Sequence, residues 1–329
     1  MTTREHINEY FNGRPFMTLS ALALVAATVV ALSMGVRPVE MSSTGVFFSF
    51  KGYLMDQVPL SAALNLLCVL AAGGIMLALN KVFSFVRSTT RLFVSSFFLL
   101  QLAHPSGLVS LNAGTLLAAV TAIAVLPLFA SYQDRHSQRS IFLIFAMVAA
   151  GTMFHYGFLA LIPAFMLGFL NMGVFNLKGL LAMLFGLVTP FWIVMGLGIA
   201  SPADFNVPHI DGIWNTALQP QASVTLLLAV ATALLGVVLA VMNLMTIMNY
   251  RMQTRVYNAF FVFVLVAMVI ALCVDYSDVA VYLPLLNLMV GVQLAHAHTL
   301  RATRAHRYLL IVLFIVGCAA FFTANLMAP

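Results

Sequence analysis

Apolar runs of about 20 residues follow one another along almost the whole chain, and this feature constrains the fold more than any other. A helix of about 20 residues is long enough to cross the hydrocarbon core of a bilayer. The runs lack the alternation of apolar and polar residues that marks a membrane-spanning strand. The sequence therefore predicts an all-α, polytopic transmembrane helical bundle.

The composition excludes a soluble domain. Of the 329 residues, 63% are hydrophobic and only 7% are charged, whereas soluble domains carry about 25% charged residues. In hydrocarbon every backbone amide must be hydrogen-bonded within the protein, which also favours helices. Because the charge balance of +6 is spread over short loops, we read it as a topology signal and expect no nucleic-acid partner.

The apolar runs divide into about eleven spans, which form a single transmembrane domain over residues 1–329. Two of the divisions between spans are not evident from hydropathy. The division at His104-Pro105-Ser106-Gly107 rests on Pro and Gly as helix breakers, and the division at His155-Tyr156-Gly157 rests on charge placement. The predicted spans are 16–36, 59–80, 88–104, 113–131, 139–155, 158–174, 179–200, 223–248, 256–274, 279–297 and 308–327.

The distribution of charge predicts the topology, because cytoplasmic loops retain Lys and Arg. With these spans, all of the 15 Lys and Arg residues except Arg37 and Lys51 fall on one side. A single span across 139–178 would place later clusters of arginines on the other side, so two spans are favoured. We expect a cytoplasmic N-terminal segment at 1–15, outer loops at 37–58 and 201–222, and an external C-terminus. Most acids fall outside: Glu40, Asp56, Asp204, Asp211, Asp275 and Asp278.

Four segments carry a family resemblance: 47–50, 98–111, 154–163 and 186–191. Their apolar patterns resemble those of an uncharacterised family of polytopic inner-membrane proteins of Bacteroidota. The resemblance implies a membrane-helical fold and a location in the bacterial inner (plasma) membrane. It assigns neither an activity nor a catalytic residue.

Two acids of the first outer loop, Glu40 and Asp56, are the candidate catalytic residues. An enzyme that transfers a sugar from a lipid-phosphate carrier needs a carboxylate base near the membrane surface. Their position is similar to that of the acids in the first outer loop of GT-C glycosyltransferases, although those enzymes often have adjacent acids there and are usually longer. The alternative is that both acids are solvated loop residues.

The candidate substrate-binding residues also lie on the outer side. Arg37 and Lys51, the only cations predicted there, would bind a carrier phosphate, or else Arg37 snorkels and Lys51 pairs with a loop acid. His209 and Trp214 in the second long loop would complete the rim. The remaining candidates are two turn histidines that either approach a common pocket or bond to backbone carbonyls: His104 and His155.

A second basic cluster is predicted on the inner face. It either binds an anionic lipid head group or a polyprenyl phosphate, or it is only a topology signal. The cluster comprises His296, His298, Arg301, Arg304, His306 and Arg307.

Motifs for several enzyme classes are missing from the sequence. It contains no Walker, GxGxxG, HExxH or GxSxG motif. The spacing of Cys68, Cys273 and Cys318 suggests neither a disulfide framework nor a zinc site. We therefore expect no cofactor and no metal. The sequence also places no carboxylate at mid-membrane depth, which argues against a proton-coupled pump.

Three functional classes remain. The first is a transferase that acts on a lipid-linked glycan at the outer face of the membrane. The second is a transporter or lipid flippase, and the third is a non-catalytic membrane subunit of an envelope complex. Membrane lipids, a polyprenyl-phosphate carrier and other membrane proteins are the partners that these classes require.

Overall fold

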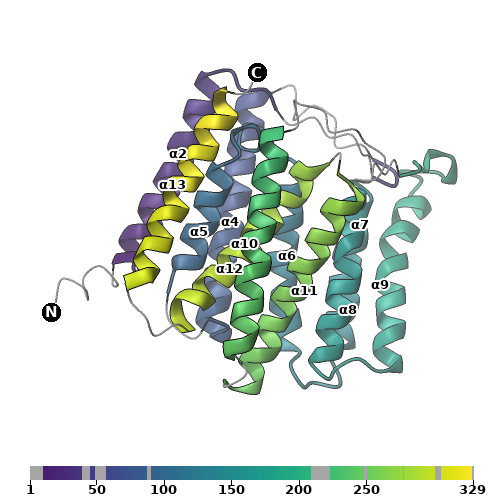
Figure 1. The fold of residues 1–329 in the computed structure, drawn as a ribbon. Helices are drawn as coiled ribbons and strands as arrows, with labels where there is room; N and C mark the ends of the chain where they lie inside the picture. Colours follow the sequence, from purple (N-terminus) through teal and green to yellow (C-terminus); the bar gives the residue numbers. More distant parts are fainter. Residues whose placement is uncertain are drawn as a thin grey trace.

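The computed structural model describes residues 10–38, 45–48, 57–86, 90–208, 223–247, 250–276, 278–300 and 305–327. Within these ranges the regular structure is helical and contains no strand, which confirms the all-α prediction (Figure 1). One α-helix lies in each of the predicted span ranges. The helices are α2 (Arg14–Ser33), α4 (Val58–Phe83), α5 (Leu92–Leu102), α6 (Ala113–Ala130), α7 (Gln138–Thr152), α8 (Leu161–Asn171), α9 (Leu177–Gly196), α10 (Ser223–Ile247), α11 (Met252–Val274), α12 (Val279–Leu300) and α13 (Ala305–Met327).

Seven of the described helices are long and apolar enough to cross a membrane: α2, α4, α6, α9, α10, α11 and α12. The helices α5, α7 and α8 are shorter, as is the part of α13 from Ile311 to Met327. The protein is therefore a multi-pass membrane protein. The two predicted helix breaks are present as short 3-10 helices, η1 (Pro105–Gly107) between α5 and α6 and η2 (Tyr156–Ala160) between α7 and α8.

The side chains of local polar residues explain where some of these helices begin. Asn112 precedes α6, and its side-chain oxygen accepts a hydrogen bond from the amide of Thr115 at 2.8 Å. Asn176 caps α9 in the same way, through the amide of Gly179 at 2.8 Å. Such caps satisfy amides that have no partner within the helix.

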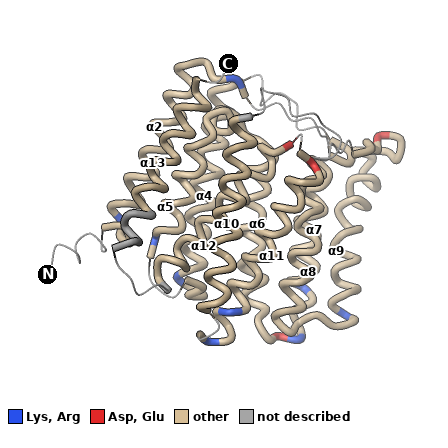
Figure 2. Tube along the Cα trace, viewed as in Figure 1, with Lys and Arg blue, Asp and Glu red and all other residues tan. Residues whose placement is uncertain are grey.

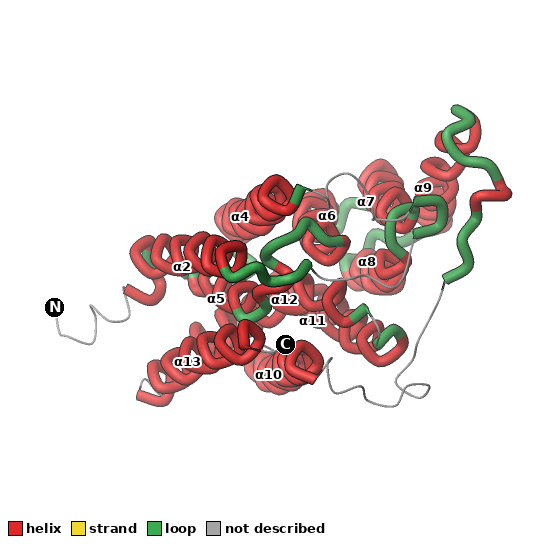
Figure 3. The backbone as a smooth tube through the Cα atoms, turned by 90° about the horizontal axis from the view of Figure 1, so that it is seen from above, coloured by secondary structure: helices red, strands yellow, loops and turns green. Residues whose placement is uncertain are grey.

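Helix α12 lies at the centre of the bundle and packs against α5, α6, α10 and α11. Viewed from above, α2 and α13 lie at one side of the molecule, and α7, α8 and α9 lie at the other (Figure 3). Helix α9 packs mainly on α7, so most of its surface faces outward.

The charged residues separate along the bundle axis (Figure 2). One end, which we call the basic end, carries most of the described cations and also Asp134. The opposite end, which we call the acidic end, carries Asp204, Asp275 and Asp278, together with Arg37. The cations of the basic end are Arg14, Lys81, Arg91, Arg135, Arg139, Lys178, Arg251 and Arg255.

Polar side chains on α12 bond to neighbouring helices inside the bundle. Asn243 of α10 donates to the side-chain oxygen of Gln293 at 2.9 Å, and Gln293 donates to Asn258 of α11 at 3.1 Å. Asn287 donates to Gln101 of α5 at 3.0 Å. All five residues are buried, so these amides join α12 to the helices around it.

Candidate functional site at the acidic end

Five of the residues that the sequence proposes for the site lie outside the described part of the chain. They are Glu40, Lys51, Asp56, His209 and Trp214. Their predicted roles therefore stay predictions. The other three, Arg37, His104 and His155, are described, and their surroundings differ.

His155 and Asp278 form a buried imidazole–carboxylate contact at the acidic end. The Nε2 atom of His155 lies 3.3 Å from Oδ2 of Asp278, and both side chains are fully buried. The other ring nitrogen, Nδ1, accepts the amide hydrogen of Gly157 at 2.9 Å. Because Nδ1 is an acceptor, the ring proton lies on Nε2, the nitrogen that faces the carboxylate. The pair joins the α7–α8 connection to the start of α12.

A second acid lies on the same turn between α11 and α12. Asp275 follows the last residue of α11, and its Oδ2 atom accepts a hydrogen bond from the Tyr282 hydroxyl at 2.7 Å. Tyr282 lies one turn into α12, so the bond crosses the turn. Both side chains are largely buried. The bond fixes the direction of the Asp275 carboxylate.

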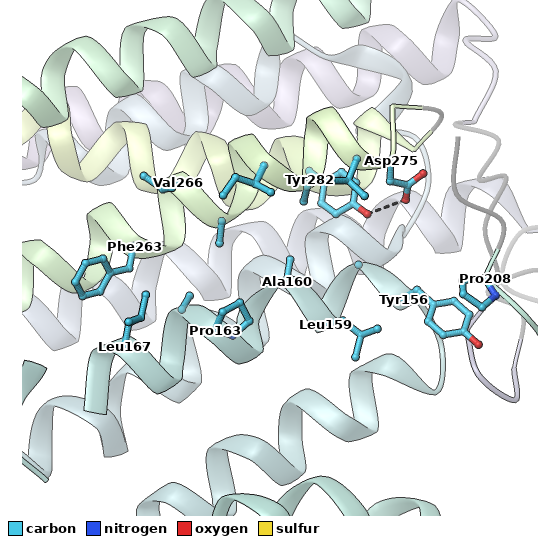
Figure 4. Close-up of a pocket in the computed structure, with 16 residues that line it drawn as sticks. Tyr156, Leu159, Ala160, Pro163, Leu167, Pro208, Phe263, Val266, Asp275 and Tyr282 are labelled. Carbon is cyan, nitrogen blue, oxygen red and sulfur yellow. Dashed lines mark hydrogen bonds between the residues drawn. The ribbon is translucent and has the colours of Figure 1, made fainter. Parts of the chain in front are cut away.

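A groove of about 420 Å³ runs between α8 and α11 and ends at this acid–hydroxyl pair (Figure 4). Its walls are apolar along α8 and α11, and Asp275, Tyr282, Tyr156 and Pro208 lie together at one end of it (Figure 4). Several wall residues are exposed at the surface of the bundle, so the groove opens sideways to the surrounding lipid. These exposed residues are Leu159, Leu167, Val266, Ile270 and Val274.

The loop between α2 and α4 and the loop after α9 meet beside this end of the groove. The amide of Val46 donates to the carbonyl of Thr152 at 3.0 Å, and the carbonyl of Val46 accepts from the amide of Asn206 at 2.9 Å. The Tyr156 hydroxyl donates to the carbonyl of Asn206. A Cβ atom on Gly45 would lie 2.2 Å from the carbonyl oxygen of Met153, so this approach requires glycine. The described piece of the loop between α2 and α4, residues 45–48, is therefore fixed next to the groove.

Aromatic contacts support the same placement of the first loop. The rings of Phe47 and Phe191 lie 6.0 Å apart and meet edge to face, and the ring of Phe48 lies 5.3 Å from that of Phe154. Such pairs add specific packing to the loop's backbone bonds. The segment 45–48 lies in the sequence between the two acids predicted as catalytic, Glu40 and Asp56.

His104 and Arg37 have other surroundings. His104 is buried in the turn after α5, where its Nε2 atom lies 3.4 Å from the Ser106 hydroxyl and its ring covers Gly107. Arg37 is exposed beyond the end of α2. Helices α2 and α5 pack on each other, and α8 lies toward the opposite side of the bundle (Figure 3). The two turn histidines, His104 and His155, therefore contact different residues.

Sequence reasoning located Asp275 and Asp278 on the outer side but did not assign them to a site. The pairing of His155 with Asp278 joins segments that are far apart in the chain, so no local sequence pattern predicts it. Tyr282 lies inside an apolar run, where an isolated tyrosine resembles a packing residue. A sequence signal was nevertheless present. Asp275, Asp278 and Tyr282 are spaced by three and four residues, which places them near the start of one helix.

Comparison with known proteins gives one match. Residues 40–328 match the model of a family described only as a family of unknown function (DUF6427). Neither the curated proteins nor the solved structures contain a match. Since the family model covers all the described helices except α2, the chain belongs to the DUF6427 family.

Proposed function

We propose that the chain crosses the bacterial inner membrane eleven times, with the basic end in the cytoplasm and the acidic end outside. The positive-inside rule supports this orientation, because Arg37 is the only described Lys or Arg at the acidic end. The short helices α5, α7 and α8 count as spans in this arrangement, since neighbouring helices shield short spans from lipid. Helix α5 is buried along nearly its whole length, as such shielding requires.

Within this topology, the proposed function is to bind an amphiphile from the outer leaflet and act on its head group. The observation that carries the proposal is the α8–α11 groove, which is apolar along its walls, open to lipid and closed at one end by Asp275 and Tyr282. An apolar chain would lie along α8 and α11. A buried carboxylate at the end of the groove selects a head group with hydrogen-bond donors, such as the hydroxyls of a sugar.

A transferase acting on a lipid-linked glycan is the reaction class that combines these features. Transfer to an acceptor hydroxyl requires a carboxylate that removes its proton. Glu40 and Asp56 remain the proposed bases, because residues 45–48, which lie between them in the sequence, are fixed beside the groove. Asp275 would orient the sugar, and Lys51 of the same loop would bind the carrier phosphate, since no Lys or Arg occurs among the described lining residues.

A lipid transporter is the second candidate, and the amide network on α12 favours it. Asn258 Nδ2 and Asn287 Oδ1 are buried and have no hydrogen-bond partner among the described residues. Buried polar atoms of this kind provide sites for a polar group that moves through a bundle. The groove at the acidic end would then be the exit for the substrate.

Blocking the groove tests the proposed function. Ala267 lines the groove, and Ala267→Phe should fill it and reduce the co-purified amphiphile by about tenfold, because a bulky ring occupies the path of the chain. Ala26→Phe is the matched control, since Ala26 is exposed on α2 away from the groove. Lipids bound to each purified protein would be measured by native mass spectrometry. Equal retention by the two variants would contradict binding in the groove.

A cellular glycan assay then separates the reaction classes. Glu40→Gln and Asp56→Asn remove charge with little change in size. In a transferase, at least one of them should lower glycan transfer by about 100-fold or more, the range of a lost general base. Full transfer by both folded variants would exclude the transferase. If the same variants retained lipid unchanged but altered its translocation across the membrane, the transporter would be favoured.

A further inference from the structure

A second cavity, of about 560 Å³, lies at the basic end between α2, α4 and the start of α5, away from the groove. Three of its lining residues are cations that come from three different elements. Arg14 begins α2, Lys81 lies in the last turn of α4, and Arg91 immediately precedes α5. The cavity also contains the polar side chains of Asn80, Ser84 and Thr90.

The local sequence explains why the connection between α4 and α5 surrounds this cavity. The side-chain oxygen of Asn80 accepts the amide hydrogen of Val86 at 2.8 Å, and Ser84 takes the left-handed conformation with φ of 49°. These two features end α4 and turn the chain back. Phe85 and Val86 are buried, whereas Ser84 and Lys81 are exposed and line the cavity.

The segment before α2 is fixed to the same place. The carbonyl of Asn12 accepts the amide hydrogen of Arg91 at 3.2 Å, and its side-chain oxygen accepts from the Thr90 hydroxyl. The Thr90 oxygen in turn accepts from the amide of Leu92, the first residue of α5, at 3.1 Å. The bonds between Asn12 and the Thr90–Arg91 segment therefore hold the start of α2 next to the start of α5, where both arginines line one cavity.

The three cations have no acidic partner in the described part of the chain. The contacts between acids and basic side chains found there are His136 with Asp134 and His155 with Asp278, and the described residues that line the cavity include neither Asp nor Glu. Like charges around one hollow repel each other unless an anion lies between them. Arg, Lys and hydroxyl donors are the groups that bind the oxygens of a phosphate.

The cavity continues along α4 toward the middle of the bundle as an apolar strip. Gly74, Leu77 and Ala78 line it, and Gly74 and Ala78 are exposed. Gly74 lies seven residues before Lys81, which is about 10 Å along the helix axis. A Cβ atom at Gly74 would meet nothing within 4 Å. The strip therefore provides open apolar surface next to the cations.

We propose that this cavity binds the phosphate of an anionic phospholipid, with one acyl chain along the strip on α4. The shared chemistry is a phosphate oxyanion held by Arg14, Lys81 and Arg91, and the adjacent apolar surface favours a lipid over a free phosphate. The inference is independent of the groove between α8 and α11, because the two sites lie at opposite ends of the bundle and differ in charge.

Lipid binding by the purified full-length chain in a zwitterionic detergent tests the charge requirement. We expect dilauroyl phosphatidylglycerol to bind at least about tenfold more tightly than dilauroyl phosphatidylcholine. Lys81→Gln should weaken phosphatidylglycerol binding by about fivefold, the typical effect of one cation near an anionic lipid. Lys178→Gln is the matched control, because Lys178 is an exposed cation of the same end at the start of α9. Equal affinity for the two lipids, or equal effects of the two substitutions, would overturn the proposal.

A second variant separates a lipid from free phosphate. Gly74→Trp should fill the apolar strip and weaken phosphatidylglycerol binding by about fivefold or more, because the cavity would still accept a phosphate but not the chain. Competition by glycerol 3-phosphate, measured on the same protein, should be unchanged by this substitution. Unaltered phosphatidylglycerol binding in Gly74→Trp would show that no acyl chain lies along the strip, and the assignment of the cavity to a lipid would be wrong.

Discussion

Helices α12 and α9 are both long and apolar enough to cross a membrane, yet the protein uses them in opposite ways. In α12, 89% of the residues in the most apolar stretch are buried, against 17% in α9. The central helix contains Asn287, Gln293 and His296, all buried. The peripheral helix exposes large apolar side chains, among them Phe185 and Trp192. Buried polar side chains thus mark the helix inside the bundle, and large exposed apolar side chains mark the helix at its edge.

The largest expected effect concerns Asp278, the acid that precedes α12, in comparison with Asp204, the acid that follows α9. Leaving a buried carboxylate without its partner costs about 3–5 kcal/mol, so we expect His155→Leu to lower the free energy of unfolding by this amount. The variant leaves the Asp278 carboxylate without its imidazole and the Gly157 amide without its acceptor. Unfolding by a denaturing detergent measures the change. Adding Asp278→Asn should recover part of the loss, and a loss below about 1 kcal/mol would contradict the pair's role.

The glycines of the two helices give the next comparison. A Cβ atom on Gly291 of α12 would lie 2.6 Å from the carbonyl oxygen of Phe93 on α5, whereas one on Gly196 of α9 would meet nothing within 4 Å. We expect Gly291→Ala to cost about 1–3 kcal/mol because the two backbones must separate. Gly196→Ala should leave the melting temperature unchanged or raise it slightly. Equal melting temperatures for the two variants would mean that α12 and α5 are not in close contact.

A smaller effect is expected from the amide network. Gln293→Leu removes the bonds to Asn243 and Asn258, and bonds of this type in membrane bundles contribute about 0.6 kcal/mol on average. Because two bonds are lost, we expect a decrease of about 1 kcal/mol in the free energy of unfolding. Met195→Leu on the exposed face of α9 is the control and should change it by less than about 0.5 kcal/mol. A more stable Gln293→Leu variant would show that the network does not stabilise the fold.

The smallest effect belongs to Asp204, which is exposed in the loop after α9. Hydrogen bonds from the backbone amide and hydroxyl of Ser201 lower the pKa of its carboxyl. A lowered pKa contributes stability above the pKa of the unfolded chain, about 3.9, and that contribution is lost as the pH falls through the folded value. Asp204→Asn should therefore remove a slight acid destabilisation, visible in melting curves between pH 5 and pH 3. Identical pH dependence in both proteins would contradict the prediction.

The sequence alone allowed much of the fold to be predicted. Hydropathy located a helix in every span range, and the rule for Lys and Arg separated α7 from α8 where hydropathy was ambiguous. The short α5 was also placed, because Pro105 and Gly107 interrupt the apolar run. The order of the helices around α12 was not predictable, since apolar faces of similar composition pack in many arrangements.

The candidate site was less accessible to sequence reasoning. Charge patterns indicated the outer loops, and His155 was chosen for its turn position. Its partner Asp278 and the groove next to Asp275 depend on how α8 and α11 pack, which no local pattern encodes. The basic cavity was missed for the same reason, because Arg14, Lys81 and Arg91 come from separate elements and share a site only after folding.

The most direct test of the central claim is a density map of the full-length protein in nanodiscs made with lipids from its native membrane. We predict elongated density between α8 and α11 that continues into a head group beside Asp275 and Tyr282. The same map of Ala267→Phe should lack that density while the helices keep their positions. A groove filled by its own side chains, or lipid density that never reaches Asp275, would contradict the claim that this site binds an amphiphile by its head group.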